Sequence, residues 1–232
     1  MTPPGRAQIR QQTHRLIASR HPTIGVFDDL SADPADLRAA FLLEAITNDR
    51  LAAARITRLP EAEIVTGPTA SLVMAAFLHA DAAGGRFSDG RLGAWYAAFD
   101  LETAIAETLD HNHRRLSRSD GGFPNRISMR QLLAQIDTGL IDVRGLQDQR
   151  PELYHATDYS ASQAYAAALR WPKAGAPGNG IVFDSVRRAG GVNVCVFWPS
   201  RLTLPVIQAD HFEYRWTAQG VASVVKLTGV AL

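Results

Sequence analysis

Residues 84–111, GGRFSDGRLGAWYAAFDLETAIAETLDH, place a glycine-rich turn, a strand and a helix one after another. The glycine pair leads into Arg86, and the apolar, aromatic run AWYAA predicts a strand. Asp100 is a good N-cap for the helix that follows, and this helix carries Glu107. A turn, a strand and a helix in this order can direct an arginine, a tyrosine and a carboxylate at one ligand.

The rest of the chain reads as helices first and strands later. Asp33-Pro34 predicts the start of a helix, because Asp33 is a good N-cap and Pro34 suits the first helical position. Residues 1–11 are expected to be frayed or to form a short helix, and residues 126–134 fit either a strand or a short helix. Other helices are expected at residues 49–55, 70–80 and 158–169, and strands at residues 13–19, 180–183, 192–198, 212–216 and 221–227.

This order of elements favours an α+β fold over a doubly wound sheet. The chain has 232 residues, of which 46% are hydrophobic and 20% charged, so a sizeable core is feasible. No repeat, low-complexity tract or interdomain linker is evident. We therefore expect one domain over residues 1–232, with an N-terminal strand and helical elaboration at residues 1–80 and the main part at residues 81–232.

Charge and cysteine content narrow the choice of partners and compartment. The net charge is +1 and the basic pairs are short, which argues against direct nucleic-acid binding. The lone Cys195 lies in an apolar run and is expected to be a buried, inert thiol. The sequence shows neither a signal-peptide pattern nor an apolar stretch of membrane-spanning length. We expect a cytoplasmic protein with no membrane partner.

Several familiar motifs are missing from the sequence. The histidines His79, His111 and His113 lack the cysteine or carboxylate spacing of a zinc site, so no metal is expected. There is no GxSxG elbow, no Walker loop, and no GxGxxG motif after a strand. The sequence therefore does not indicate an α/β-hydrolase, a P-loop NTPase or a Rossmann-type dinucleotide-binding protein.

The run GGRFSDG…WYAA…ETAIAET resembles the RES-domain toxins, which are partners of Xre-type antitoxins in bacterial toxin–antitoxin pairs. The family is named after an Arg, a Glu and a Ser. The resemblance extends in order over roughly residues 12–218. The other matching segments are HRLIASR at 14–20, TGPTAS at 66–71, DYSASQ at 158–163 and GIVFDSVR at 180–187.

The resemblance implies a fold similar to that of ADP-ribosyltransferases and an activity that consumes NAD. It also implies an Xre-type antitoxin that blocks the NAD cleft and assembles with the toxin into a hetero-oligomer. Cleavage of the nicotinamide–ribose bond passes through an oxocarbenium-like transition state. An enzyme assists by placing a carboxylate near the ribose, holding the diphosphate with fixed donors and stacking an aromatic ring on the nicotinamide.

The resemblance assigns Glu107 to the family's Glu, which would bind the ribose hydroxyls and stabilise the cation. It assigns Arg15 to the leading Arg, and a planar guanidinium there would grip the diphosphate. Relatives more often carry an aromatic residue at His14. Without the resemblance, Glu107 would be read as a surface glutamate and Arg15 as a solvated strand arginine. For the family's Ser, Ser185 at a strand end is preferred to Ser160 at a helix start, where backbone N–H groups favour a phosphate or ribose oxygen.

Two residues of the opening stretch complete the predicted NAD site. Arg86 is a second phosphate contact or a structural arginine that satisfies loop carbonyls, and the GGRF match favours the first. Tyr96 stacks on the nicotinamide or is a core aromatic with its hydroxyl satisfied.

The leading hypothesis is a toxin that cleaves NAD and transfers ADP-ribose to a host protein. Release of ADP-ribose to water or phosphate, which depletes NAD, is the alternative within the same chemistry. A second class is an RNA-cleaving toxin that uses Glu107, His111 and Arg86 as acid, base and phosphate clamp. A third class is a non-catalytic binding module.

Overall fold

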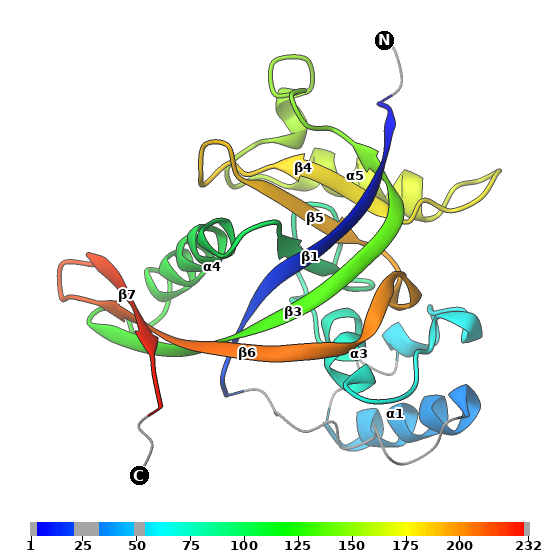
Figure 1. Cartoon of the computed structure of the whole chain (residues 1–232), viewed down its shortest axis with the longest axis horizontal. Helices are drawn as coiled ribbons and strands as arrows, with labels where there is room; N and C mark the ends of the chain where they lie inside the picture. The colour runs from blue at the N-terminus through cyan, green and yellow to red at the C-terminus, as the bar shows by residue number, and fades with distance from the viewer. Residues whose placement is uncertain (1–3, 21–32, 49–53, 230–232) are drawn as a thin grey trace.

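The computed structural model describes residues 4–20, 33–48 and 54–229. Figure 1 shows the arrangement of the elements along the chain. The helices are α1 (Pro34–Asn48), α3 (Ala70–Leu78), α4 (Leu101–Leu116) and α5 (Ser160–Arg170), with 3-10 turns η1 (Glu61–Glu63), η2 (Pro151–Leu153) and η3 (Pro199–Arg201). The strands are β1 (Arg6–Ala18), β2 (Trp95–Ala98), β3 (Asn125–Asp142), β4 (Gly180–Asp184), β5 (Val192–Val196), β6 (Leu202–Trp216) and β7 (Ala222–Leu227).

Within the described residues, seven strands form one sheet in the order β1-β2-β5-β4-β3-β6-β7. β1 also pairs antiparallel with β3 along its whole length, so the first five strands of this order close into a ring. The ring is weakest at the seam between β1 and β2, where the register is limited to His14↔Ala98. Beyond this pair, the backbones of β1 and β2 are not paired with each other.

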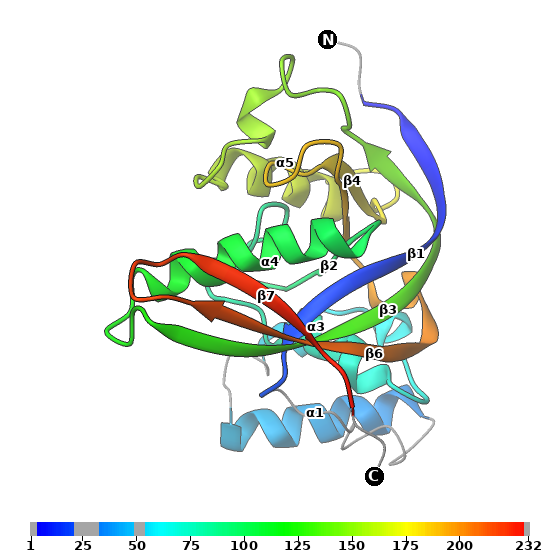
Figure 2. The same ribbon diagram turned by 60° about the vertical axis from the view of Figure 1, so that its left-hand side comes forward.

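The helices cover different parts of the sheet (Figures 1 and 2). α4 contacts β1, β2 and β5, whereas α3 contacts β2 and β6, and α5 contacts β4. α1 lies beside α3, at the lower edge of both views. Both α3 and α4 thus contact β2, and α4 also contacts β1, so the two helices lie near the β1–β2 seam.

Two hydrophobic clusters hold these layers together. The larger cluster extends from Ile9 in β1 to Val206 in β6 and includes Phe77 of α3 and the fully buried Trp95 of β2. The smaller cluster lies under α4 and includes the fully buried Tyr214. Leu101, Ile105 and Leu109 of α4 recur at helical spacing and all pack against this smaller cluster.

The α+β class predicted from the order of elements is confirmed. The local signals also hold: Asp100 Oδ1 caps α4 by accepting a hydrogen bond from Thr103 N at 2.7 Å, and Asp33 Oδ1 accepts from Ala35 N at 2.9 Å. The prediction of a frayed segment or short helix at residues 1–11 was wrong for residues 6–11. These residues continue the strand expected at residues 13–19, so that β1 runs over residues 6–18 and pairs with β3 throughout. The ambiguous residues 126–134 belong to the long strand β3. The predicted helix at residues 49–55 lies largely outside the described residues.

Cys195 is fully buried in β5, as predicted. Burial raises the pKa of its thiol to about 12, so the sulfur stays protonated at neutral pH. Among the helices of residues 33–48 and 54–229, none combines the length and apolar character needed to cross a bilayer.

Candidate active site

A cavity of about 550 Å³ opens at the β1–β2 seam and reaches from α3 to α4. This volume is within the range of ordinary small-molecule and cofactor sites. Small side chains leave room for it, including Ala97 and Ala98 of β2 and Ala75 and Ala76 of α3. The polar and charged residues that line it include Arg15, Arg86, Tyr96, Glu107, His111 and Tyr159.

Glu107 of α4 faces this cavity and is partly buried, so its reading as an ordinary surface glutamate was wrong. Its Oε1 atom accepts one hydrogen bond from Ser185 Oγ at 2.7 Å and another from Asn193 Nδ2 at 2.8 Å. Both donors therefore converge on one carboxylate oxygen. The carboxylate is held in orientation through this atom, and Oε2 remains the oxygen that can contact a ligand.

Ser185 follows β4, and two backbone N–H groups of the turn after it fix the direction of its hydroxyl proton. Its Oγ accepts hydrogen bonds from the N–H groups of Arg187 and Arg188, each at 3.0 Å. A hydroxyl has one proton and two acceptor sites, so the proton is directed to Glu107. The structure thus brings together Glu107 and Ser185, two of the three residues predicted to be catalytic.

Asn193 was missed by the sequence reasoning. It lies in β5, where its backbone is paired with Ala98 of β2 and Phe183 of β4, and its side chain is only 5% exposed. Buried amides are hydrogen-bonded, and the partner of this one is Glu107. The available signal was an asparagine inside the otherwise apolar run 192–198.

The hydroxyl of Tyr96 hydrogen-bonds to the glycine-rich turn of residues 84–88. Its hydroxyl accepts a hydrogen bond from Phe87 N at 2.8 Å and lies 3.0 Å from Ser88 Oγ. A Cβ at Gly85 would lie 2.8 Å from the tyrosine hydroxyl, so only glycine fits there without a shift. The Tyr96 hydroxyl is therefore satisfied, as the structural reading expected, while the residue also lines the cavity. Stacking on nicotinamide stays a prediction.

Arg86 serves the protein scaffold and lines the cavity at the same time. Its Nη1 donates to the carbonyls of Leu153 at 2.9 Å and His155 at 2.8 Å, and its guanidinium lies 4.8 Å from the centre of the Tyr159 ring. Burial lowers its pKa, while Tyr159 and the nearby Glu107 raise it. Part of the structural reading is thus observed, and a phosphate contact by Arg86 stays a prediction.

Arg15 of β1 lines the same cavity. Its Nη1 donates to Tyr96 O at 2.9 Å, and its guanidinium lies 4.9 Å from the centre of the Trp95 ring. Burial lowers its pKa to about 10, so it remains a cation at neutral pH. This hydrogen bond lies next to His14↔Ala98 and bridges the β1–β2 seam where strand pairing has ended.

Ser160, the other candidate serine, is exposed at the first position of α5. Its N–H donates to Asp158 Oδ1 at 2.9 Å, and it is not among the residues that line the cavity. The structure therefore places Ser185, and not Ser160, beside Glu107. His111, one helical turn after Glu107, does line the cavity, and burial together with Arg114 and Arg115 lowers its pKa.

These features define an α+β protein with a partly buried, oriented carboxylate in a cavity large enough for a nucleotide. The sequence model of the RES domain family matches residues 58–217, and the chain belongs to this family. An uncharacterized protein, y4oC of Sinorhizobium fredii, is 26% identical over 218 residues, which cover 92% of this chain and 86% of that protein. The crystal structure of the M. tuberculosis MbcT–MbcA toxin–antitoxin complex matches 97% of this chain and 87% of its own, with 14% identity and a TM-score of 0.42.

Proposed function

We propose that the protein is an NAD-consuming toxin of a toxin–antitoxin pair, which cleaves the nicotinamide–ribose bond and transfers ADP-ribose to a protein. The single observation that carries this proposal is the carboxylate of Glu107, held through one oxygen by Ser185 and Asn193 and turned to a cavity of about 550 Å³. Membership of the RES domain family supports the same reading.

The chemistry assigns a role to each part of the cavity. As nicotinamide leaves, positive charge develops on the ribose, and the free oxygen of Glu107 binds the ribose hydroxyls and stabilises that charge. Arg15 and Arg86 supply positive charge for the diphosphate, and Tyr96 offers a ring to the nicotinamide. Ser185 acts on the substrate through Glu107, because its only proton is directed to that carboxylate.

The partner in this proposal is an Xre-type antitoxin that covers the cavity in a hetero-oligomer within the cytoplasm. The N-terminal part of the single domain, residues 1–80, is assigned to the surface that receives the protein acceptor. The antitoxin is implied by the family resemblance, and the acceptor surface is inferred from the length of the N-terminal part.

Incubating the antitoxin-free protein with labelled NAD tests the reaction, with and without cell lysate. A labelled protein band supports transfer. Free ADP-ribose without such a band would replace transfer by hydrolysis, and ADP-ribose 1″-phosphate would identify phosphate as the acceptor. Degradation of RNA with NAD left intact would overturn the proposal in favour of an RNA-cleaving toxin.

Replacing Asn193 with alanine is expected to lower kcat about tenfold and to change KM much less. The variant loses one of the two hydrogen bonds that orient Glu107, a loss on the order of 1–2 kcal/mol that is felt mainly in the transition state. Steady-state NAD consumption measures both constants.

Asn179→Ala is the matched control for this variant. The amide of Asn179 donates to Thr138 Oγ1 and Gly139 O, and it does not line the cavity. Equal losses of kcat in the two variants would show that Asn193 has only a structural role.

A further inference from the structure

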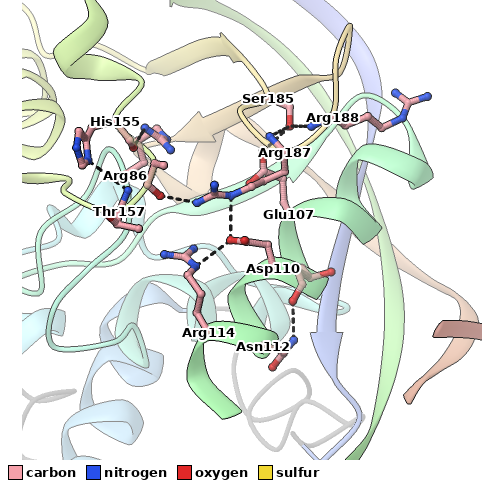
Figure 3. Close-up of polar contacts among 12 residues, drawn as sticks. Arg86, Glu107, Asp110, Asn112, Arg114, His155, Thr157, Ser185, Arg187 and Arg188 are labelled. Carbon is pink, nitrogen blue, oxygen red and sulfur yellow. Dashed lines mark hydrogen bonds and ion pairs between the residues drawn. The ribbon is translucent and has the colours of Figure 1, made fainter. Parts of the chain in front are cut away.

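Two arginine side chains, Arg114 and Arg187, share the carboxylate of Asp110 beside the Glu107 cavity, and Arg86 lies near them (Figure 3). We call Arg86, Arg114 and Arg187, together with Asp110 and Tyr159, the arginine cluster. Arg114, Arg86 and Tyr159 line the cavity itself. Asp110 and Arg114 lie on α4, one and two turns beyond Glu107, whereas Arg187 comes from the turn after β4.

The contacts in this cluster bring like charges together. Arg114 Nε lies 2.8 Å and Arg187 Nε 2.9 Å from the same oxygen, Oδ2 of Asp110. Arg114 Nη2 donates to the Tyr159 hydroxyl at 3.3 Å, and Arg86 stacks on the Tyr159 ring. Arg187 also donates to the carbonyl of Ala156. The three guanidinium groups are thus held close to one another by a single carboxylate and a phenol.

The charges of the cluster do not balance. Arg114 and Arg187 share the single carboxylate of Asp110, and the charge of Arg187 lowers the pKa of the nearby Arg86. The carboxylate of Glu107 raises the pKa of Arg86, but it is bound to Ser185 and Asn193. Burial and the nearby Arg114 and Arg115 lower the pKa of His111, which favours its neutral form. Guanidinium groups that are half-buried with excess positive charge are suited to a ligand with two negative charges.

We propose that the arginine cluster is the subsite for the diphosphate of the dinucleotide, with Arg114 and Arg187 joining Arg86. This inference rests on the proposed function. Within the described residues, Arg114 and Arg187 make these contacts through Nε and Nη2, so Nη1 of each remains available to a phosphate oxygen. Asp110 lies one helical turn, about 5 Å of rise, beyond Glu107, so a ribose at Glu107 brings its 5′-phosphate to the cluster.

The binding test uses Glu107→Gln protein, which is expected to bind NAD without consuming it. Isothermal titration with NAD and with nicotinamide riboside, which lacks phosphate, is repeated after adding Arg114→Gln or Arg187→Gln. Each added change is expected to weaken NAD binding about tenfold and to leave riboside binding unchanged. Adding Asp110→Asn, which removes the competing carboxylate, is expected to tighten NAD binding.

Arg188→Gln is the matched control, because Arg188 lies in the same turn but pairs with Asp100 and donates to Thr103 on the other side. If Arg114→Gln and Arg187→Gln bind NAD as tightly as Arg188→Gln does, the subsite is refuted while the proposed function stands. If the parent protein ignores NAD altogether, the proposed function itself fails. If a glutamine variant has a lowered thermal midpoint, the corresponding lysine variant, Arg114→Lys or Arg187→Lys, is measured in its place. The lysine keeps the positive charge of the arginine.

Discussion

Replacing Glu107 with glutamine is expected to reduce NAD cleavage by about 10²–10³-fold or more and to abolish toxicity. The change is nearly isosteric, since glutamate and glutamine have almost the same shape. Both hydrogen bonds of Glu107 end on Oε1, so a glutamine amide can place its oxygen at this position and keep the contacts with Ser185 and Asn193. Only the negative charge facing the ribose is lost, so the result reports on transition-state stabilisation and not on packing.

Two measurements check this expectation: NAD consumption by the purified protein, and growth of cells that express the variant without antitoxin. Glu102→Gln is the matched control, since Glu102 lies on the first turn of the same helix and is exposed. The thermal unfolding midpoints of the wild type, the Glu107→Gln variant and the Glu102→Gln variant should agree. A Glu107→Gln protein that remains fully toxic would favour the non-catalytic binding module.

Replacing Arg170 with leucine is expected to lower the free energy of unfolding by about 3–5 kcal/mol. The Arg170 side chain is only 3% exposed and donates to the carbonyls of Leu92, Gly93 and Phe197. Its guanidinium also lies 5.0 Å from the centre of the Trp198 ring. Leucine would leave three buried carbonyls without this donor, and these carbonyls lie just before β2 and just after β5.

Urea denaturation followed by far-UV circular dichroism measures this loss. Arg10→Leu is the control, because Arg10 is exposed and pairs with Asp137 on the surface, where such a pair contributes about 0–1 kcal/mol. Equal midpoints for Arg170→Leu and Arg10→Leu would contradict the structural role of Arg170. Because β2 carries Tyr96, the Arg170 variant is also expected to lose activity at lower urea concentrations than the wild type.

The local structure around Glu107 could be predicted because its signals lie within a few residues of one another. Asp100 caps α4 through Thr103, and the stripe of Leu101, Ile105 and Leu109 faces the smaller cluster. The glycine pair before Arg86 indicated a turn, and Gly84 has φ +75° there. Capping, helical period and positive φ are properties of short segments, so the sequence alone reveals them.

The two long strands β1 and β3 were harder to predict, since their burial depends on distant partners. β3 buries four successive residues at 129–132, whereas alternating exposure would leave one of the two neighbours Arg130 and Gln131 at the surface. In this stretch β3 is paired with β1 at one edge and with β6 at the other. Pairing between segments as distant in the chain as β1 and β3 leaves little trace in either segment alone.

The sequence by itself determined the α+β class, the helix that carries Glu107, the buried thiol of Cys195 and the family resemblance that singled out Glu107 and Ser185. Only the tertiary structure decided that Ser185 and Asn193, 78 and 86 residues from Glu107, donate to the same carboxylate oxygen. The same holds for the cavity at the β1–β2 seam and for the two arginines that share Asp110. The physical reason is that a helix or a cap is stabilised by neighbours in the chain, whereas a site is made by strand register and side-chain contacts between distant segments.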